Sequence, residues 1–350
     1  MAEQIKMKAV VTYAPHDYRL ELLDIPSPPE GGMVIKVESC GICAGDAKAY
    51  AGGERFWGGG EFARYIEPPC VPGHEFCGRV HALGAGATGF AIGERVIAEQ
   101  LVPCYECAYC LAGQRHLCDP HDVFGFKRYL NGGCAEYAAL PKKAIVHRVP
   151  ESLSSEYAML IEPLACAMHA VDRGSMTGED FVVISGGGTL GLLMTAYAAT
   201  MAPKYLVSLE PVAAKRALAL SLGASAAFDP QDKGLSAYIG ERTGGMGCSL
   251  YIDAAGHPQS VVNGLALIKK GGKFVEFSVF TEKTLSDWSV IGDAKELCIY
   301  GSSLSPGLYP KAIEYLVSGR VKPEGVVSRL FGIDEYKQAF AATASCSRRW

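Results

Sequence analysis

Four cysteines crowd into one short segment of the chain: Cys104, Cys107, Cys110 and Cys118. Thiolates separated by two, two and seven residues can close a tetrahedron around Zn²⁺ and leave no position open, which is typical of a structural site. An iron–sulfur cluster is the rival reading, but the bacterial ferredoxin run has a shorter third gap and a proline directly after its fourth cysteine. Asp119 precedes Pro120 here. The spacing therefore predicts structural zinc.

A second set of metal-ligating side chains is scattered along the chain: Cys43, His74, Glu75 and Glu162. A catalytic zinc takes three protein ligands and keeps one position open. One thiolate, one imidazole and one carboxylate neutralise Zn²⁺ and keep it a Lewis acid, so Glu75 and Glu162 are expected to alternate or share. Asp46 is placed to orient the imidazole of His74. Taken alone, a cysteine is more often a core residue and a histidine in a turn is more often structural.

A glycine-rich turn follows the apolar run Phe181–Ser185 and opens a helical pattern. Glycines here let a pyrophosphate approach backbone N–H groups at a helix N-terminus. Glu210 ends the next apolar run, where a carboxylate accepts hydrogen bonds from the adenosine ribose and repels a 2′-phosphate, which favours NAD over NADP. A solvated residue ahead of a helix is the plainer reading of Glu210. The residues expected in the turn are Gly186, Gly188, Thr189, Leu190 and Gly191.

Further candidates for cofactor contact follow two later apolar runs. Ala255 comes after the run ending at Asp253, and Ser278 and Val279 come after the run that begins at Lys273. In open α/β sheets, ligands bind at the carboxyl ends of the strands, so these residues are candidates for the same edge. Cys134, Cys248 and Cys298 are expected to be ordinary core residues.

The elements that must position these groups change character along the chain. Up to about residue 150, short apolar runs alternate with Gly and Pro, which indicates a β-rich module. From Phe181, apolar runs alternate with helical patterns such as Ala213–Leu222, which predicts a parallel sheet wound with helices. After about Leu297 the pattern gives one strand and then a helix over Tyr309–Ser318.

Composition supports a globular protein that binds small ligands. The 350 residues are 49% hydrophobic and 20% charged, which excludes a disordered chain, and 33 basic against 37 acidic residues give a net charge of −4. Without a basic cluster, nucleic acid and anionic membranes are not expected partners. No run reaches membrane-spanning length, the N-terminus shows no leader, and the 13 cysteines are expected to stay reduced in the cytoplasm.

Together these motifs resemble the zinc-dependent medium-chain dehydrogenase/reductase family, from about Lys8 to Phe340. Glu162-Pro163-Leu164 is similar to the sorbitol dehydrogenase branch, and segments such as Phe56-Trp57-Gly58 and Phe124–Arg128 are similar to bacterial erythritol/threitol dehydrogenases. The resemblance implies a GroES-like catalytic domain with an inserted Rossmann domain, an active site in the cleft between them, and a homodimer or homotetramer paired through Rossmann sheet edges.

The resemblance also sets the expected boundaries. The α/β chain is expected to form a GroES-like domain over 1–163 with a zinc lobe at 100–120, a Rossmann NAD-binding domain over 164–298, and a return to the catalytic domain over 299–350.

Two departures from the family pattern stand out. Gly45 occupies the position where relatives carry a Ser or Thr that relays the alcohol proton, which leaves Lys48 and Tyr50 as substitutes. Relatives also end on a short strand, whereas this chain ends at Ser345–Trp350, so a catalytic-domain strand is expected to be missing.

We expect an NAD-dependent zinc dehydrogenase that oxidises a secondary hydroxyl of a polyol to a ketose. The alternatives are a secondary-alcohol, butanediol or threonine dehydrogenase, and a catalytically weak NAD-binding or sensor protein.

Overall fold

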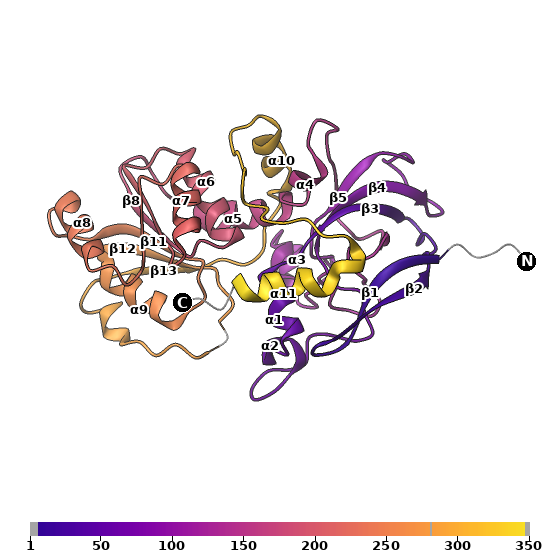
Figure 1. Cartoon of the computed structure of the whole chain (residues 1–350), viewed down its shortest axis with the longest axis horizontal. Helices are drawn as coiled ribbons and strands as arrows, with labels where there is room; N and C mark the ends of the chain where they lie inside the picture. Colours follow the sequence, from indigo (N-terminus) through magenta and orange to yellow (C-terminus); the bar gives the residue numbers. More distant parts are fainter. Residues whose placement is uncertain (1–5, 281, 347–350) are drawn as a thin grey trace, which may run out of the picture. The chain divides into compact units, whose positions relative to one another are not determined.

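The structure, a computed structural model, describes residues 6–280 and 282–346, with the side chains of 344–346 left aside. The predictions about a leader and about a missing final strand fall mainly on residues 1–5 and 347–350, which lie outside these ranges. The chain divides into two compact units, each described here by itself (Figure 1).

The first unit runs to Glu162 and takes up two later pieces, Tyr309–Val317 and the segment from Arg329. The second unit holds Pro163–Leu308 and Ser318–Ser328. Relative to the expected boundaries, residues 299–308 and 318–328 therefore group with the second unit.

The first unit is built on antiparallel sheets. A five-stranded sheet has the order β6-β3-β4-β5-β7, and a separate ribbon pairs β1 with β2. Buried side chains of β3, β4 and β5 share a core with Phe124 and Leu140. The strands are β1 (Lys6–Ala14), β2 (Asp17–Asp24), β3 (Met33–Gly41), β4 (Glu75–Leu83), β5 (Arg95–Ala98), β6 (Tyr137–Leu140) and β7 (Val146–Arg148).

The helices of the first unit are short. The sequence pattern predicted the one over Tyr309–Val317, whereas the others showed no helical period. Most lie in the connections between strands, and the remaining ones follow the last strand that the structure describes. They are α1 (Ala44–Tyr50), α2 (Glu54–Trp57), α3 (Ala108–Leu111), η1 (Arg115–Leu117), α4 (Ser155–Ala158), α10 (Tyr309–Val317), η3 (Ile333–Glu335) and α11 (Tyr336–Cys346).

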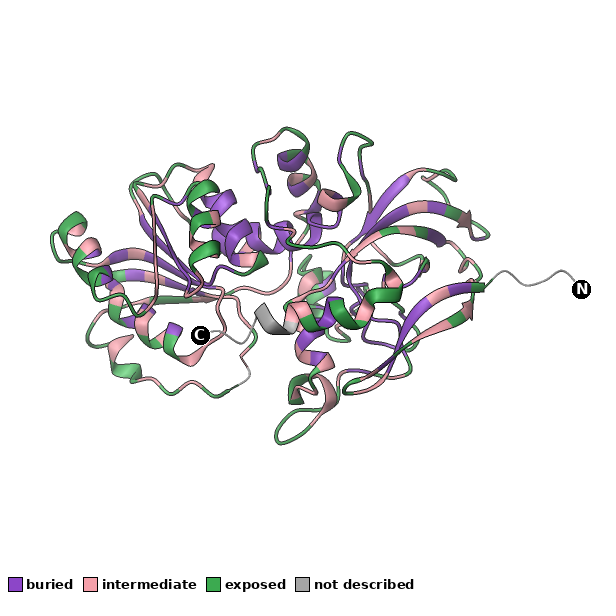
Figure 2. Cartoon of the chain, in the orientation of Figure 1, coloured by how far each residue is buried: buried purple, intermediate pink, exposed green. Residues whose placement is uncertain are grey.

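The second unit is a six-stranded parallel sheet with the order β10-β9-β8-β11-β12-β13. Chain order reverses between β8 and β11, which makes their carboxyl ends the switch point of a doubly wound sheet. All five residues of β8 are buried, as a central strand covered on both faces requires (Figure 2). The strands are β8 (Phe181–Ser185), β9 (Tyr205–Leu209), β10 (Ala226–Phe228), β11 (Cys248–Asp253), β12 (Ile268–Glu276) and β13 (Cys298–Gly301).

The predicted α/β fold, a β-rich module with a doubly wound parallel sheet, is confirmed. Cys248 is buried as predicted, but the prediction for Cys298 is wrong, because β13 is an edge strand and Cys298 is exposed. Within the described part of the chain, none of the helices combines the length and apolar character that a membrane crossing requires. The helices of this unit are α5 (Ile161–Arg173), α6 (Thr189–Ala199), α7 (Ala213–Ser221), α8 (Gly234–Thr243), α9 (Pro258–Leu267) and η2 (Trp288–Val290).

Candidate functional site

Helix α1 fixes the positions of Cys43 and Asp46. Cys43 is its N-cap residue, and the Cys43 Sγ accepts a hydrogen bond from the Gly45 N–H at 3.4 Å. In return, the carboxylate of Asp46 accepts one from the Cys43 N–H at 3.0 Å. This reciprocal arrangement satisfies two backbone donors that a helix start otherwise leaves open, so the thiol and the carboxylate are held as a pair.

The start of β4 brings His74 and Glu75 to the same place. One ligand atom each of Cys43, His74 and Glu75 lie within 4.8 Å of one another. An Oδ of Asp46 lies 3.6 Å from Nδ1 of His74, and this buried nitrogen makes no hydrogen bond. Asp46 therefore lies where a carboxylate can orient the ring of His74, and this role stays a prediction.

Burial and mutual repulsion raise the pKa of the acids in this group. Burial, and then the nearby charge of Glu162, raises the pKa of Glu75 to about 8. Burial raises the pKa of the Cys43 thiol well above its usual range, with Glu75 and Asp46 adding to the effect. Burial also raises the pKa of Asp46. Acids crowded away from water either keep their protons or ionise beside a cation that joins them.

These residues fit a bound zinc ion. A thiol, an imidazole and a carboxylate form a donor set that Zn²⁺ accepts, and a divalent cation relieves the repulsion among the buried acids. Glu162 is 5% exposed and close enough to raise the pKa of Glu75, yet it falls outside the group of ligand atoms within 4.8 Å. Glu75 is therefore the carboxylate that the structure places beside Cys43 and His74.

An aromatic wall borders this group. The ring of Phe126 lies 5.6 Å from that of His74, and Phe56 stacks on Phe126 at 5.8 Å. Tyr65 packs on Phe126 at 5.3 Å. Phe56 and Phe126 both lie in segments that the family resemblance singled out, but the contact of Phe126 with His74 was not predicted. The run Phe124-Gly125-Phe126 directly after the cysteine segment was the available signal, because two aromatics around a glycine often line a turn.

Gly45 leaves space beside the thiol. A Cβ at this position would lie 3.6 Å from Cys43 Sγ and 3.9 Å from Phe56 Cζ, which are ordinary contact distances. Of the two substitutes for a relay hydroxyl, Tyr50 packs its ring against Tyr18 and Phe340, which is a structural position. Lys48 is half-buried.

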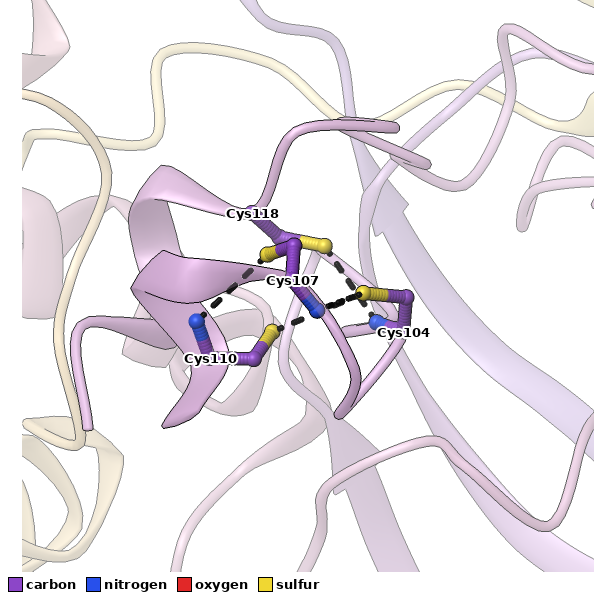
Figure 3. Close-up of side chains that lie close together, drawn as sticks. All are labelled: Cys104, Cys107, Cys110 and Cys118. Atoms are coloured by element: carbon purple, nitrogen blue, oxygen red, sulfur yellow. Dashed lines mark hydrogen bonds between the residues drawn. The ribbon is translucent and has the colours of Figure 1, made fainter. Parts of the chain in front are cut away.

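The four cysteines of the predicted structural site converge (Figure 3). One ligand atom from each lies within 4.8 Å of the others, and Cys104 Sγ accepts the N–H of Cys107 at 3.3 Å. Backbone N–H groups of Asp119 and Cys110 lower the pKa of the Cys107 thiol to about 7. Such N–H donors stabilise thiolates, so the loop fits a metal bound by Cys104, Cys107, Cys110 and Cys118.

The glycine-rich turn lies between the C-terminal end of β8 and helix α6. Gly186 has φ +106° and sits against the backbone of Ala254, and Gly191 sits against the carbonyl of Gly186. A side chain at either position would collide with backbone. Gly188 caps α6 without a side-chain hydrogen bond, and Thr189 beside it is exposed. Leu190 is half-buried in the same first turn. The helix N-terminus thus offers free N–H groups to an anion.

Glu210 is a buried anchor at the end of β9. Its carboxylate accepts the N–H of Gly187 at 2.8 Å and the N–H of Val212 at 2.9 Å. It is 4% exposed, so the alternative that Glu210 is a solvated residue ahead of a helix is wrong. The two donors aim a fixed negative charge at the glycine-rich turn.

The further cofactor candidates, Ala255, Ser278 and Val279, lie around Asp253 and Gly256. The N–H of Ala255 donates to the Asp253 carboxylate at 3.1 Å, and the hydroxyl of Ser278 donates to the Asp253 carbonyl at 3.2 Å. Gly256 packs against Ser278 and the backbone of Val279. Asp253 itself is fully buried and accepts a hydrogen bond from Ser260 at 2.6 Å. It is therefore a support for this loop.

Two segments of the chain match known protein families. Residues 29–151 match the alcohol dehydrogenase GroES-like domain, and residues 189–318 match the zinc-binding dehydrogenase domain. An erythritol/L-threitol dehydrogenase of Mycolicibacterium smegmatis is 40% identical over 99% of this chain and 97% of its own length.

Two solved structures carry nucleotides. A protein assigned to the zinc-binding dehydrogenases from Sinorhizobium meliloti 1021, bound to NADP, superposes with a TM-score of 0.87 at 30% identity, covering 97% of this chain and 96% of its own. RspB of Escherichia coli CFT073, complexed with NADH, gives 0.85 at 28%, covering 96% and 95%. The chain belongs to the zinc-dependent alcohol dehydrogenases of the medium-chain dehydrogenase/reductase family.

Proposed function

We propose that this protein oxidises a secondary hydroxyl of a polyol of the erythritol, threitol or sorbitol type to a ketose, with NAD⁺ as hydride acceptor. The observation that carries the proposal is the convergence of Cys43, His74 and Glu75 within 4.8 Å. The 40% identity to an erythritol/L-threitol dehydrogenase over nearly the whole chain supports the substrate class.

In this proposal Cys43, His74 and Glu75 hold a catalytic zinc, with Glu162 as an alternative carboxylate. Zinc supplies a Lewis acid that polarises the substrate hydroxyl and lowers its pKa. Asp46 keeps the ring of His74 in the ligating orientation, and Phe126, on which Phe56 stacks, packs beside that ring. Gly45 offers no hydroxyl to carry the substrate proton onward, so the proton leaves through water or another group.

The nucleotide site of the proposal is the edge of the sheet around Gly186, Gly188 and Gly191. The N-terminus of α6 receives the pyrophosphate, and Glu210 receives the adenosine ribose. The buried charge of Glu210 repels a 2′-phosphate, so we propose NAD rather than NADP. Ala255, Ser278 and Val279 complete this edge.

We also propose that the four-cysteine lobe holds a structural zinc, and that the protein works in the cytoplasm as a homodimer or homotetramer. The twelve cysteines whose side chains the structure describes are all free, which suits a reducing compartment. Among the described strands, β13 pairs only with β12, and Ile299 on it is 44% exposed, so this edge is open to a second copy. Light scattering coupled to gel filtration tests the assembly.

The function is tested by following NADH formation with four- to six-carbon polyols, simple secondary alcohols and threonine, each repeated with NADP⁺. Cys43→Ala should abolish turnover, and Cys248→Ala, which also removes a buried thiol, should retain it. Turnover of a polyol that a chelator stops supports the proposal. Silence across the panel, with about two zinc ions bound per chain, favours the sensor alternative.

A further inference from the structure

The C-terminal helix packs directly on the helix that carries Cys43 (Figure 1). Phe340 of α11 is 1% exposed, and its ring lies 5.4 Å from Tyr50 of α1 and 5.3 Å from Tyr18 of β2. Tyr336, one turn earlier on α11, donates its hydroxyl to the carbonyl of Tyr18 at 2.8 Å. One aromatic cluster therefore joins the end of the chain to α1.

The same cluster touches both ends of α1. Ile42, directly before Cys43, and Tyr50, at the last position of the helix, both pack against the buried cluster that Val10, Tyr18 and Phe340 form. Cys43 and Asp46 lie between these two points of attachment. A shift of α1 on this cluster therefore moves the thiol and the carboxylate together.

Helix α1 cannot hold its own position. It has seven residues, and helices shorter than about 12 residues are marginal in water without tertiary packing. Its orientation therefore comes from the residues it packs on. A metal site needs ligand atoms placed to within about 0.5 Å, so loss of this packing affects metal binding before it affects the rest of the fold.

We propose that Phe340 is a positioning residue for the catalytic zinc, acting through Ile42 and Tyr50 on Cys43 and Asp46. The inference rests on the proposed zinc site at Cys43, and it adds that the C-terminal helix is part of that site's support. Phe340 packs its ring on Tyr18 and Tyr50 and is not among the clustered ligands Cys43, His74 and Glu75. Its effect is on how tightly the ion is retained.

The test measures zinc content and the rate of zinc release to a colorimetric chelator. Wild type should bind about two ions per chain, and Cys43→Ala should show the lobe ion alone. Phe340→Ala should release the second ion at least about tenfold faster, and Phe340→Leu, which keeps an apolar side chain, should fall between. The matched control is Leu140→Ala, which empties a fully buried site of the same unit away from α1.

The possible outcomes distinguish a failure of the positioning role of Phe340 from a failure of the proposed zinc site. If Phe340→Ala and Leu140→Ala lower the melting temperature and leave both zinc release rates at the wild-type value, the positioning role is wrong while the zinc site stands. If wild type holds only the ion that Cys43→Ala also retains, the catalytic zinc itself is wrong and this inference fails with it. Should Phe340→Ala not fold, Phe340→Leu alone decides, because wild-type release from it overturns the proposal.

Discussion

The carboxylate of Asp46 lies 3.6 Å from Nδ1 of His74 while it accepts the backbone N–H of Cys43. One side chain thus touches two of the three clustered ligands. The helix start that positions the thiol also orients the imidazole, so the site is prepared before a metal arrives.

Asp46→Asn tests this link. The amide oxygen can still accept the N–H of Cys43, but the negative charge toward His74 is lost, so we expect zinc affinity and kcat/KM to fall by about 10- to 100-fold. Zinc titration and steady-state kinetics measure both. Asp24→Asn, at an exposed carboxylate on β2, should change neither. Unchanged zinc affinity in Asp46→Asn would show that the carboxylate only caps α1.

Gly45→Ser tests the missing relay. The added side chain has room beside Cys43 Sγ and Phe56, so we expect a folded protein that is more stable by about 0.5 kcal/mol. A hydroxyl beside the substrate position should raise kcat at neutral pH and shift the pH–rate profile. Gly240→Ser in α8, which also adds a side chain in open space, should raise stability and leave kcat and the pH–rate profile unchanged. Identical pH–rate profiles for both variants would show that a hydroxyl at position 45 does not relay the substrate proton.

The sequence predicted which residues would meet but not how they are supported. Spacing alone identified the cysteine lobe, because its four thiols lie in one loop. Cys43 and His74 are separated by a long stretch of chain, so no local spacing joins them, and their grouping rested on the chemistry of the donor set and on the family resemblance. The short helix α1 shows no helical period long enough to detect, and its packing on Phe340 depends on a fold that returns from the far end of the chain. Phe126 was missed because its contact with His74 also joins residues that lie far apart in the sequence.

Zinc binding should release protons. Without metal, the pKa of Glu75 is about 8 and that of Cys43 lies well above its usual value, so both groups hold protons at pH 7. Zinc displaces these protons, and its affinity should therefore rise with pH through about 8. Calorimetry of metal-free protein in buffers of different ionisation enthalpy counts the protons.

The same shifts set the stability of the metal-free protein. The folded-state pKa of Glu75 is raised above its unfolded value, so its contribution is present at low pH and lost as pH rises through about 8. The melting temperature of the metal-free protein should then fall as pH rises from about 4.5, the ordinary pKa of a glutamate, to about 8, and zinc should reverse the fall. A metal-free melting temperature that rises with pH would contradict the buried Glu75.

Glu210→Gln tests nucleotide choice. The amide keeps an acceptor for the N–H of Gly187 and removes the charge, so kcat/KM with NADP⁺ relative to NAD⁺ should rise about tenfold. Asp180→Asn is the matched control, because Asp180 also accepts a backbone N–H, from Thr177 at 2.7 Å, but lies before β8, at the opposite end of that strand from the glycine-rich turn. An unchanged ratio in Glu210→Gln would mean that Glu210 anchors the turn without reading the ribose.

Cys107→Ser tests the cysteine lobe. A hydroxyl is a far weaker zinc ligand than the thiolate that backbone N–H groups stabilise here, so the variant should lose about one zinc ion per chain and unfold at a lower temperature. Cys298→Ser, at an exposed cysteine outside both ligand groups, should keep about two ions and the wild-type melting temperature. The catalytic zinc should remain in Cys107→Ser, because the ligands Cys43, His74 and Glu75 come from α1 and β4. Loss of both ions together would instead make the lobe a condition for folding of the whole first unit.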